Sequence, residues 1–374
     1  MRYFIITGEL SGDMHAAAMV NALKQIDSKA EFQFTGGSYL QTACNSKPLV
    51  ALENMSFMGF YEVIRNIKTI SNNFKQIKSA IFKFKPHALI LVDYPGFNLR
   101  MAKWAKQQGL DVFYYIAPSV WAWNTSRISV LKQYVNRLYV ILPFEYNFFK
   151  NHLLEVEFVG HPLAERIALE QHTEQYGLLK MQGLGKKPII AVFPGSRSQE
   201  VKRILPECLG LTAAFPDYDC VISKSPLLPW AYYENAKALG FKVIEGAAYE
   251  ILKHAKAGVI KSGTSTLEAA LFNVPQVVVY KTSKLSFLIA KLLVKLKFIS
   301  LVNLILNKEV VKELIQQQCN TVQIINALKQ CIEHTAYQHT ILNEYATLRS
   351  MLQHQGVSSR LAQSVYKRIV KDAF

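Results

Sequence analysis

The sequence predicts an α/β fold of two doubly wound domains, each with a parallel sheet covered by helices on both faces. Three observations support this prediction. Short apolar runs typical of strands alternate with helical patterns along most of the chain. The alternation stops once, near residues 161–187, and then resumes. The length of 374 residues is also too great for one ordinary core and suits two domains.

The first domain contains six predicted strands with helical patterns between them. The opening stretch MRYFIITGEL has a short apolar run that turns acidic at once, so it is interpreted as the first strand and not as a signal peptide. The segment FNLRMAKWAKQQG is interpreted as a helix, because its apolar residues recur on one face. The strands are expected at residues 2–7, 32–35, 88–92, 112–116, 138–141 and 156–159.

The second domain resumes the alternation and is followed by a helical segment. Its strands are expected at residues 188–193, 220–223, 242–244, 258–261 and 276–280. From about residue 308 the pattern is helical to the end. Ligands of doubly wound domains bind at the carboxyl ends of the strands. The loops that follow the strands are therefore the candidate sites.

The composition narrows the classes of function. The formal net charge is +16, which calls for an anionic partner such as a nucleic acid, a membrane or a phosphorylated small molecule. The chain has no signature of a common nucleic-acid-binding module. Its five cysteines are odd in number and form no CxxC pair, which argues against disulfides or zinc and fits a reducing cytosol.

The lysines are concentrated in residues 281–298. Lys281, Lys284, Lys291, Lys295 and Lys297 lie there among apolar residues. No uncharged run approaches the ~20 residues that a membrane span needs. Two interpretations remain open: an amphipathic segment on an anionic bilayer surface, or a core helix with a solvated lysine edge.

Two loops of the first domain carry polar groups directly after strands. In TGELSGD, residues 7–13, glycines permit a close approach to the backbone, although a tight turn with a capped helix is the simpler interpretation. In LVDYPGFN, residues 91–98, Asp93 ends an apolar strand, where a carboxylate is costly to bury without partners. Asp93 is either a general base at the mouth of a site or part of an Asx turn.

Two loops of the second domain suit an anion. Gly195, Ser196 and Arg197 open a helix after a strand, and an arginine adds paired donors to the helix N-terminus. The stretch SGTSTLE, residues 262–268, also places small hydroxyl residues at a helix start. Each loop alone can be ordinary helix capping. Together they make a diphosphate more plausible, with Glu268 placed to hold a ribose.

These loops, in this order, resemble the lipid-A-disaccharide synthase family. The resemblance covers most of the chain and rests on many short motifs in register. They are GExSGD at 8–13, GG at 36–37, MGxxEV at 58–63, DxPxFN at 93–98, SVWAW at 119–123, LPFE at 142–145, GHP at 160–162, PGSR at 194–197, SGTxTLE at 262–268, a counterpart of SLxN at 300–303 and VVKELIQ at 310–316. The chain departs from the family pattern at Leu10, at residues 38–40, at Gly96, where a second Asp is frequent, and at Val302, where proline is usual.

The resemblance implies the GT-B architecture, with two Rossmann-like domains facing a cleft. It implies an acceptor-side domain at residues 1–165, joined by a helical tail at about 345–374, and a UDP-sugar-binding domain at 166–344. The implied enzyme is an inverting glycosyltransferase of lipid A and lipopolysaccharide biosynthesis. It joins UDP-2,3-diacylglucosamine to 2,3-diacylglucosamine 1-phosphate and releases UDP and a β-1,6-linked disaccharide 1-phosphate.

The resemblance also implies roles for individual residues. Asp93 is expected to act as the base on the acceptor, and Arg197 to stabilise the departing UDP, with no metal or cofactor. The UDP-sugar is expected to contact Gly195, Ser196, Arg197, Ser262, Gly263, Thr264, Thr266, Glu268, Asn303, Glu313 and Gln316. The acceptor side is expected to include Gly8, Glu9, Ser11, Gly12, Asp13, Met58, Asn98 and Trp121.

The resemblance finally implies a cytoplasmic protein that associates peripherally with the anionic inner membrane, and it allows a homodimer. Two rival interpretations remain. Another UDP-sugar enzyme of the same architecture, such as a UDP-sugar 2-epimerase, would have different acceptor loops. A basic membrane-surface or nucleic-acid-binding module would explain the charge but not the two anion loops.

Overall fold

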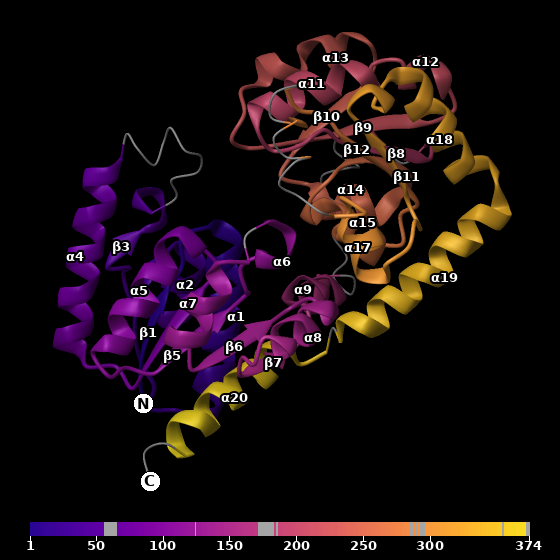
Figure 1. The fold of residues 1–374 in the computed structure, drawn as a ribbon. Coiled ribbons are helices and arrows are strands. Elements are labelled where there is room, and N and C mark those ends of the chain that lie inside the picture. Colours follow the sequence, from indigo (N-terminus) through magenta and orange to yellow (C-terminus); the bar gives the residue numbers. More distant parts are fainter. Residues whose placement is uncertain are drawn as a thin grey trace. The chain divides into compact units, whose positions relative to one another are not determined.

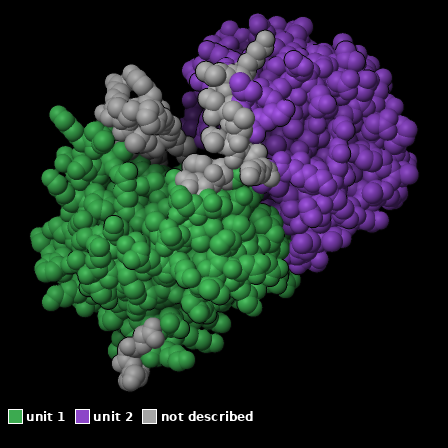
Figure 2. Space-filling model, viewed as in Figure 1, with its two compact units in different colours: residues 1–162, 352–374 green, residues 163–351 purple. Residues whose placement is uncertain are grey.

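The computed structural model describes residues 1–55, 66–123, 125–170, 183–184, 186–283, 287–288, 291, 296–353 and 355–371. The chain forms two compact units (Figures 1 and 2). Unit 1 consists of Met1–Pro162 together with Leu352–Phe374, and unit 2 is Leu163–Met351. Met58 and most of residues 284–295 lie outside the described residues, so the expectations for Met58, Lys284 and Lys295 are not addressed by the structure.

Unit 1 is built on a seven-stranded sheet in the order β3-β2-β1-β4-β5-β6-β7, in which all paired strands are parallel. The strands are β1 (Arg2–Ile6), β2 (Glu31–Gly36), β3 (Val50–Ala51), β4 (Ala88–Val92), β5 (Val112–Tyr115), β6 (Arg137–Val140) and β7 (Val156–Phe158). The order reverses between β1 and β4, so the carboxyl ends of these two strands flank a topological switch point, where doubly wound sheets bind ligands.

Helices cover both faces of this sheet. Along β1, Tyr3 and Ile5 contribute to one buried cluster, whereas Phe4 and Ile6 contribute to the other. This is why the strands are continuously apolar. The first cluster includes residues of α1 (Leu10–Ile26), α2 (Ser38–Cys44) and α20 (Val357–Lys371), and the second includes residues of α4 (Ile67–Phe84), α5 (Pro95–Gln107), α7 (Arg127–Tyr134) and α8 (Pro143–Asn151).

The last helix, α20, belongs to the core of the first unit although it is the last element of the chain. It packs against α1, and both helices are visible on the same unit in Figure 1. The Arg360 guanidinium donates to the carbonyl of Val159 at 2.8 Å from Nη2, and Ser364 donates to Glu157 at 2.6 Å. These bonds fix α20 to the end of β7.

Unit 2 is built on a six-stranded parallel sheet in the order β10-β9-β8-β11-β12-β13. The strands are β8 (Ile189–Phe193), β9 (Asp219–Lys224), β10 (Lys242–Glu245), β11 (Ala255–Lys261), β12 (Gln276–Tyr280) and β13 (Lys312–Ile315). The expectation of an entirely helical region after residue 308 is wrong at β13. That strand is a four-residue edge strand with charged residues at its start, so it shows no apolar run.

The helices of unit 2 also cover both faces of the sheet. The cluster around Ile189 and Ile260 includes α14 (Ala248–His254) and α15 (Thr264–Leu271), whereas α12 (Leu211–Ala214) and α18 (Thr321–Glu333) pack against the strands outside that cluster. The remaining helices of the described chain are α6 (Val120–Trp123), α9 (Pro162–Glu170), α11 (Ser198–Cys208), α13 (Glu234–Ala238), α17 (Leu301–Leu306) and α19 (Thr335–Leu352), with short 3-10 turns η1 (Leu52–Asn54), η2 (Trp230–Tyr233) and η3 (Gln316–Gln318).

Candidate active site

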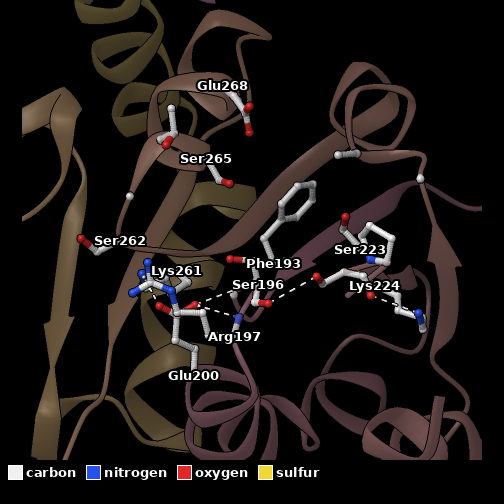
Figure 3. Close-up of a pocket in the computed structure, with 17 residues that line it drawn as sticks. Phe193, Ser196, Arg197, Glu200, Ser223, Lys224, Lys261, Ser262, Ser265 and Glu268 are labelled. Carbon is white, nitrogen blue, oxygen red and sulfur yellow. Dashed lines mark hydrogen bonds and ion pairs between the residues drawn. The ribbon is translucent and has the colours of Figure 1, made fainter. Parts of the chain in front are cut away.

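A pocket of about 470 Å³ opens at the carboxyl edge of the unit 2 sheet (Figure 3). The loops after β8, β9, β10 and β11 form it, as expected for a doubly wound domain. Its lining includes seven of the eleven residues expected to contact the UDP-sugar: Gly195, Ser196, Arg197, Ser262, Gly263, Thr264 and Glu268. The loops at 195–197 and 262–268, which are more than sixty residues apart in the sequence, therefore line the same pocket.

The first anion loop joins β8 to α11. Gly195 adopts a φ of 117°, and a Cβ there would lie 2.5 Å from the carboxylate of Glu200, so the position requires glycine. Glu200 accepts hydrogen bonds from the backbone N–H groups of Ser196 at 3.1 Å and Arg197 at 3.3 Å. The loop therefore presents N–H donors to a negative charge, as an anion-binding helix start does.

A lysine completes this part of the pocket. Lys261 is the last residue of β11, and its ammonium lies 2.8 Å from the second carboxylate oxygen of Glu200. Figure 3 shows Lys261, Arg197 and Glu200 grouped on one side of the pocket. Neither Lys261 nor Glu200 was predicted from the sequence. The signal for Glu200 was its place in the first turn of α11, where a glutamate caps the helix start.

The second anion loop joins β11 to α15. Gly263, with a φ of 152°, precedes the helix, and both Gly263 and Thr264 are exposed. The Ser262 hydroxyl donates to the carbonyl of Ile299 at 2.7 Å, and Thr266 donates to the carbonyl of Gly263 at 2.7 Å. These hydroxyls shape the loop. The Thr266 N–H also bonds to the Gly263 carbonyl at 3.1 Å, so the earlier N–H groups of α15 are the ones that suit an anion.

Glu268 lies one turn into α15 and faces the pocket opposite the Glu200 group (Figure 3). Burial raises the pKa of its carboxyl, while hydrogen bonds from Ser265 and Tyr249 and the charge of Arg166 act in the opposite direction. The Tyr249 hydroxyl lies 3.5 Å from Glu268, and Arg166 lies 5.2 Å from the centre of the Tyr249 ring. This carboxylate is held in place, which suits it to accept hydrogen bonds from a ligand.

In unit 1, polar groups gather at the carboxyl ends of β1, β4 and β6. Asp93 follows β4 with a φ of 47°, and Tyr94 follows with a φ of 50°. Left-handed backbone at two consecutive residues other than glycine is costly and tends to be kept at functional sites. The Tyr114 hydroxyl and the Asn98 amide both donate to the Asp93 carbonyl at 2.7 Å, which holds this turn.

The surroundings of Asp93 raise the pKa of its carboxyl above the ordinary value of an aspartate. Burial and, to a smaller extent, the negative charge of Glu9 raise the pKa of its carboxyl to about 6, while a hydrogen bond from the Tyr94 backbone acts in the opposite direction. Glu145, the N3 residue of α8, is buried, and this burial raises the pKa of its carboxyl to about 7. The Trp121 indole donates to Glu145 at 2.9 Å. Glu145 was not among the predicted residues.

Other predicted acceptor-side residues have structural functions. Asp13 is fully buried, and it accepts from the N–H groups of Gly37 at 2.7 Å and Tyr39 at 3.0 Å, so it caps α2. The Cβ of any residue at position 8 would collide with the ring of Tyr94, which explains Gly8. Gly12 is buried beside Val92, whereas Ser11 is exposed. Asn98 is fully buried beneath the Asp93 turn.

The family model described as lipid-A-disaccharide synthetase matches residues 3–369 of this chain. The chain belongs to the lipid-A-disaccharide synthase family. Lipid-A-disaccharide synthase 1 of Legionella pneumophila (strain Lens) is 36% identical over 363 residues, which cover 94% of this chain and 93% of that protein. Lipid-A-disaccharide synthase of Syntrophus aciditrophicus (strain SB) is 36% identical over 369 residues, with 96% and 95% covered. This membership identifies a glycosyltransferase of lipid A biosynthesis.

Solved structures with the same fold include UDP-N-acetylglucosamine 2-epimerases. The Neisseria meningitidis enzyme bound to UDP-GlcNAc superposes with a TM-score of 0.69 at 14% identity, with 98% of this chain and all of that chain covered. A protein from Listeria monocytogenes, described as a UDP-N-acetylglucosamine 2-epimerase, gives a TM-score of 0.70 at 12% identity, with 99% and 97% covered. The GT-B fold class expected for the lipid-A-disaccharide synthase family is confirmed by the two parallel sheets and by these structural relatives.

Four residues that the family resemblance assigned to the UDP-sugar do not line the pocket. Thr266 and Asn303 are fully buried. Glu313 accepts from the N–H groups of Ile299 at 3.0 Å and Ser300 at 2.9 Å, and from the Asn303 amide at 2.9 Å. Gln316 pairs with the backbone of Thr282. In this member of the family these side chains fix the chain on both sides of residues 283–299.

The described part of this synthase-family chain contains no group of three or more His, Cys, Asp or Glu residues that could hold a metal ion. Within the same residues, no helix is both long and apolar enough to cross a bilayer.

Proposed function

We propose that the unit 2 pocket binds the UDP part of UDP-2,3-diacylglucosamine and that unit 1 binds 2,3-diacylglucosamine 1-phosphate. The proposal takes its reaction from the family, whose members form the β-1,6-linked disaccharide 1-phosphate. The observation that carries it is the pocket itself, in which two N–H-presenting loops, Lys261 and Glu268 face the same space. The N–H groups and cations suit a diphosphate, and the carboxylate suits ribose hydroxyls.

In this proposal, Arg197, Lys261 and the start of α15 stabilise the charge that grows on the departing UDP. Asp93 accepts the proton of the acceptor hydroxyl as that oxygen attacks the anomeric carbon. An α-linked donor and a β-linked product require inversion by a single displacement, so one base is sufficient. The raised pKa of Asp93, about 6, places the base close to the pH at which general-base catalysis is most effective.

The direct test is incubation of the purified full chain with UDP-2,3-diacylglucosamine and 2,3-diacylglucosamine 1-phosphate. Formation of the disaccharide 1-phosphate together with UDP is expected. UDP binding is measured separately by calorimetry. A chain that binds UDP but converts the donor to an epimer without any acceptor would contradict the proposal, and a chain that does not bind UDP would remove the assignment of the pocket.

We also propose that the chain works on the anionic cytoplasmic face of the inner membrane, where its acylated substrates reside. The net charge of +16 supports this, as do the exposed Lys291 and Lys297. Lys281 differs, because it forms an ion pair with Glu207 and stabilises unit 2. Replacing Lys291, Lys295 and Lys297 with Gln should release the chain from anionic vesicles in a flotation assay while UDP affinity is kept, since each lysine near an anionic surface contributes about 1 kcal/mol. Flotation equal to that of the unchanged protein would contradict this role.

A further inference from the structure

A second large pocket, of about 650 Å³, lies in unit 1 between α4 and α5. Its volume falls in the ordinary range of small-molecule pockets. Its lining is mainly apolar and aromatic, and it includes Ile70, Phe74, Phe97 and Trp104. None of the roles proposed above for the UDP pocket or the membrane-facing lysines uses this pocket.

An aromatic row connects this pocket to the candidate base. Tyr94, the residue after Asp93, lines the pocket and stacks on Phe97 with ring centres 5.7 Å apart. Phe97 meets Phe74 edge to face at 5.2 Å. The apolar wall therefore begins one residue from the carboxylate that is proposed to act on the acceptor, and it continues away from it along α4 and α5.

The rim of the pocket is cationic. Helix α4 carries four lysines and α5 carries three basic residues, and neither helix contains an Asp or Glu. Lys78 lies 4.6 Å from the centre of the Phe74 ring and 5.1 Å from that of Trp104. Arg100 and Lys103 line the pocket, are exposed, and form no ion pair with a described residue. An apolar lumen with a positive rim suits an apolar chain attached to an anionic group.

Gly96 marks the open side of the pocket. It lines the pocket and is exposed, and a Cβ built there meets no atom within 4 Å. The position therefore accepts a Cβ without a clash, and because Gly96 lines the pocket we expect a large side chain there to occupy part of it. This gives a substitution that blocks the pocket and leaves its wall unchanged.

We infer that this pocket holds an acyl chain of the acceptor, with Lys78, Arg100 and Lys103 meeting its 1-phosphate. The inference rests on the proposed function and names the subsite that unit 1 uses. Burial of the chain among Phe74, Phe97 and Trp104 anchors the acceptor, and the continuity of the wall with Tyr94 brings the sugar to Asp93. Such remote binding positions the reacting hydroxyl.

The first test compares Gly96→Trp with the unchanged chain, using acceptors whose acyl chains differ in length. In the unchanged chain, kcat/KM should rise by about fourfold for each methylene that enters the pocket. Gly96→Trp should remove this dependence on acceptor chain length while UDP affinity and Tm are retained. Lys75→Trp, at an exposed position of α4 outside the lining, is the control and should keep the dependence. An unchanged dependence in Gly96→Trp would overturn the inference, as would a change confined to the acyl chains of the donor.

The second test addresses the rim. Arg100→Gln combined with Lys103→Gln should raise KM for the phosphorylated acceptor and have a much smaller effect on its dephosphorylated analogue. Lys75→Gln combined with Lys83→Gln, two exposed lysines of α4 that do not line the pocket, is the control. Equal effects of the two double variants would show that only the general positive charge matters, which would overturn the assignment of the phosphate to this rim.

The third test does not depend on turnover. A brominated-acyl analogue of 2,3-diacylglucosamine 1-phosphate should quench the tryptophan fluorescence of the full chain, and Trp104→Phe should remove most of that quenching. Quenching that is equally strong in Trp104→Phe overturns the inference. Quenching by brominated phosphatidylglycerol that the acceptor does not displace would assign the pocket to a bilayer lipid instead. If the unchanged chain shows the quenching but forms no disaccharide, the proposed function is contradicted and the assignment of the pocket is not.

Discussion

Lys261 and Glu200 form an ion pair of 2.8 Å inside the unit 2 pocket, and the same Glu200 carboxylate accepts hydrogen bonds from the N–H groups of Ser196 and Arg197. An internal carboxylate thus occupies the donors that suit a phosphate. A diphosphate that binds here has to share or replace the bonds made by Glu200, so we expect this residue to limit the proposed affinity for UDP.

Glu200→Gln should increase the affinity for UDP by about threefold to tenfold, equivalent to about 0.7–1.4 kcal/mol. The substitution removes the negative charge that neutralises Lys261 and repels the diphosphate, while a glutamine oxygen can still cap α11. Titration calorimetry at two salt concentrations measures the effect, which should shrink at high salt. Glu207→Gln, in the same helix and paired with Lys281, is the control. Weaker binding of UDP by Glu200→Gln would mean that the carboxylate organises the site for the ligand.

Asp93→Asn should lower the rate of transfer by about 100- to 10,000-fold, the range for loss of a general base, and leave UDP affinity unchanged. The base acts only when it is deprotonated. Because the pKa of Asp93 is raised to about 6, kcat/KM of the unchanged chain should be constant above that pH and fall as the pH drops through it. The residual activity of Asp93→Asn should lack this acid limb. Near-normal turnover by the purified variant would exclude Asp93 as the base.

Glu9→Gln should move the acid limb of the pH profile to lower pH. Glu9 raises the pKa of Asp93 through its negative charge, so its neutral analogue removes that contribution. The midpoint of the limb should stay above pH 3.8, the ordinary pKa of an aspartate, since burial is the larger cause of the shift. Rate measurements across the acid range check this, with Glu53→Gln as a control carboxylate in the same unit. A limb that does not move in Glu9→Gln would assign the profile to another group.

Arg197→Ala and Glu268→Ala should both weaken UDP binding, by different routes. Arg197→Ala should lower affinity by about tenfold to a hundredfold, the equivalent of one hydrogen bond between charged groups, and should leave uridine binding almost unchanged. Glu268→Ala should weaken UDP and uridine equally, because its proposed partner is the ribose. Calorimetry with both ligands separates the two effects. Unchanged uridine binding by Glu268→Ala would remove its ribose assignment.

Asp13→Asn should reduce the free energy of unfolding by about 1–3 kcal/mol, the cost of disrupting buried hydrogen bonds. Asparagine presents an amide N–H₂ to donors that Asp13 satisfies with two carboxylate oxygens at the start of α2. Thermal and urea unfolding measure the loss. Normal stability combined with a raised KM for the acceptor would instead favour the contact with the acceptor that the family resemblance implies.

The sequence was most informative where strands are long and apolar. The positions of β1, β4, β8 and β11 followed from their apolar runs, and the candidate site loops followed from the strand ends. Two elements could not be predicted this way. β3 has only two residues, too few to show a strand period, and β13 begins with Lys312 and Glu313, so it has no apolar run. Each pairs with a single neighbouring strand at an edge of its sheet, so the surrounding structure decides its conformation.

Some residues of the candidate site could be predicted from the sequence, and others could not. Small residues at a helix start, such as Gly195 and Gly263, could be predicted because their role depends on residues next to them in the sequence. Lys261, Arg166 and Tyr249 were not, because each matters only through a partner distant in sequence. The same reason explains Asn303 and Glu313. Their motif was recognisable, but the hydrogen bond that joins them to each other, outside the pocket lining, appears only in three dimensions.

The return of α20 to unit 1 has a consequence for biosynthesis. Val357, Leu361 and Val365 complete the apolar cluster that α1 begins. These residues are synthesised after all of unit 2, so the part of unit 1 that is made first keeps an uncovered apolar groove along α1 while unit 2 is being made. Unit 2, by contrast, has all of its residues before α20 is made. The usual order, in which the N-terminal domain folds first, is therefore reversed: the second-made unit can finish folding while the first still waits for its last helix.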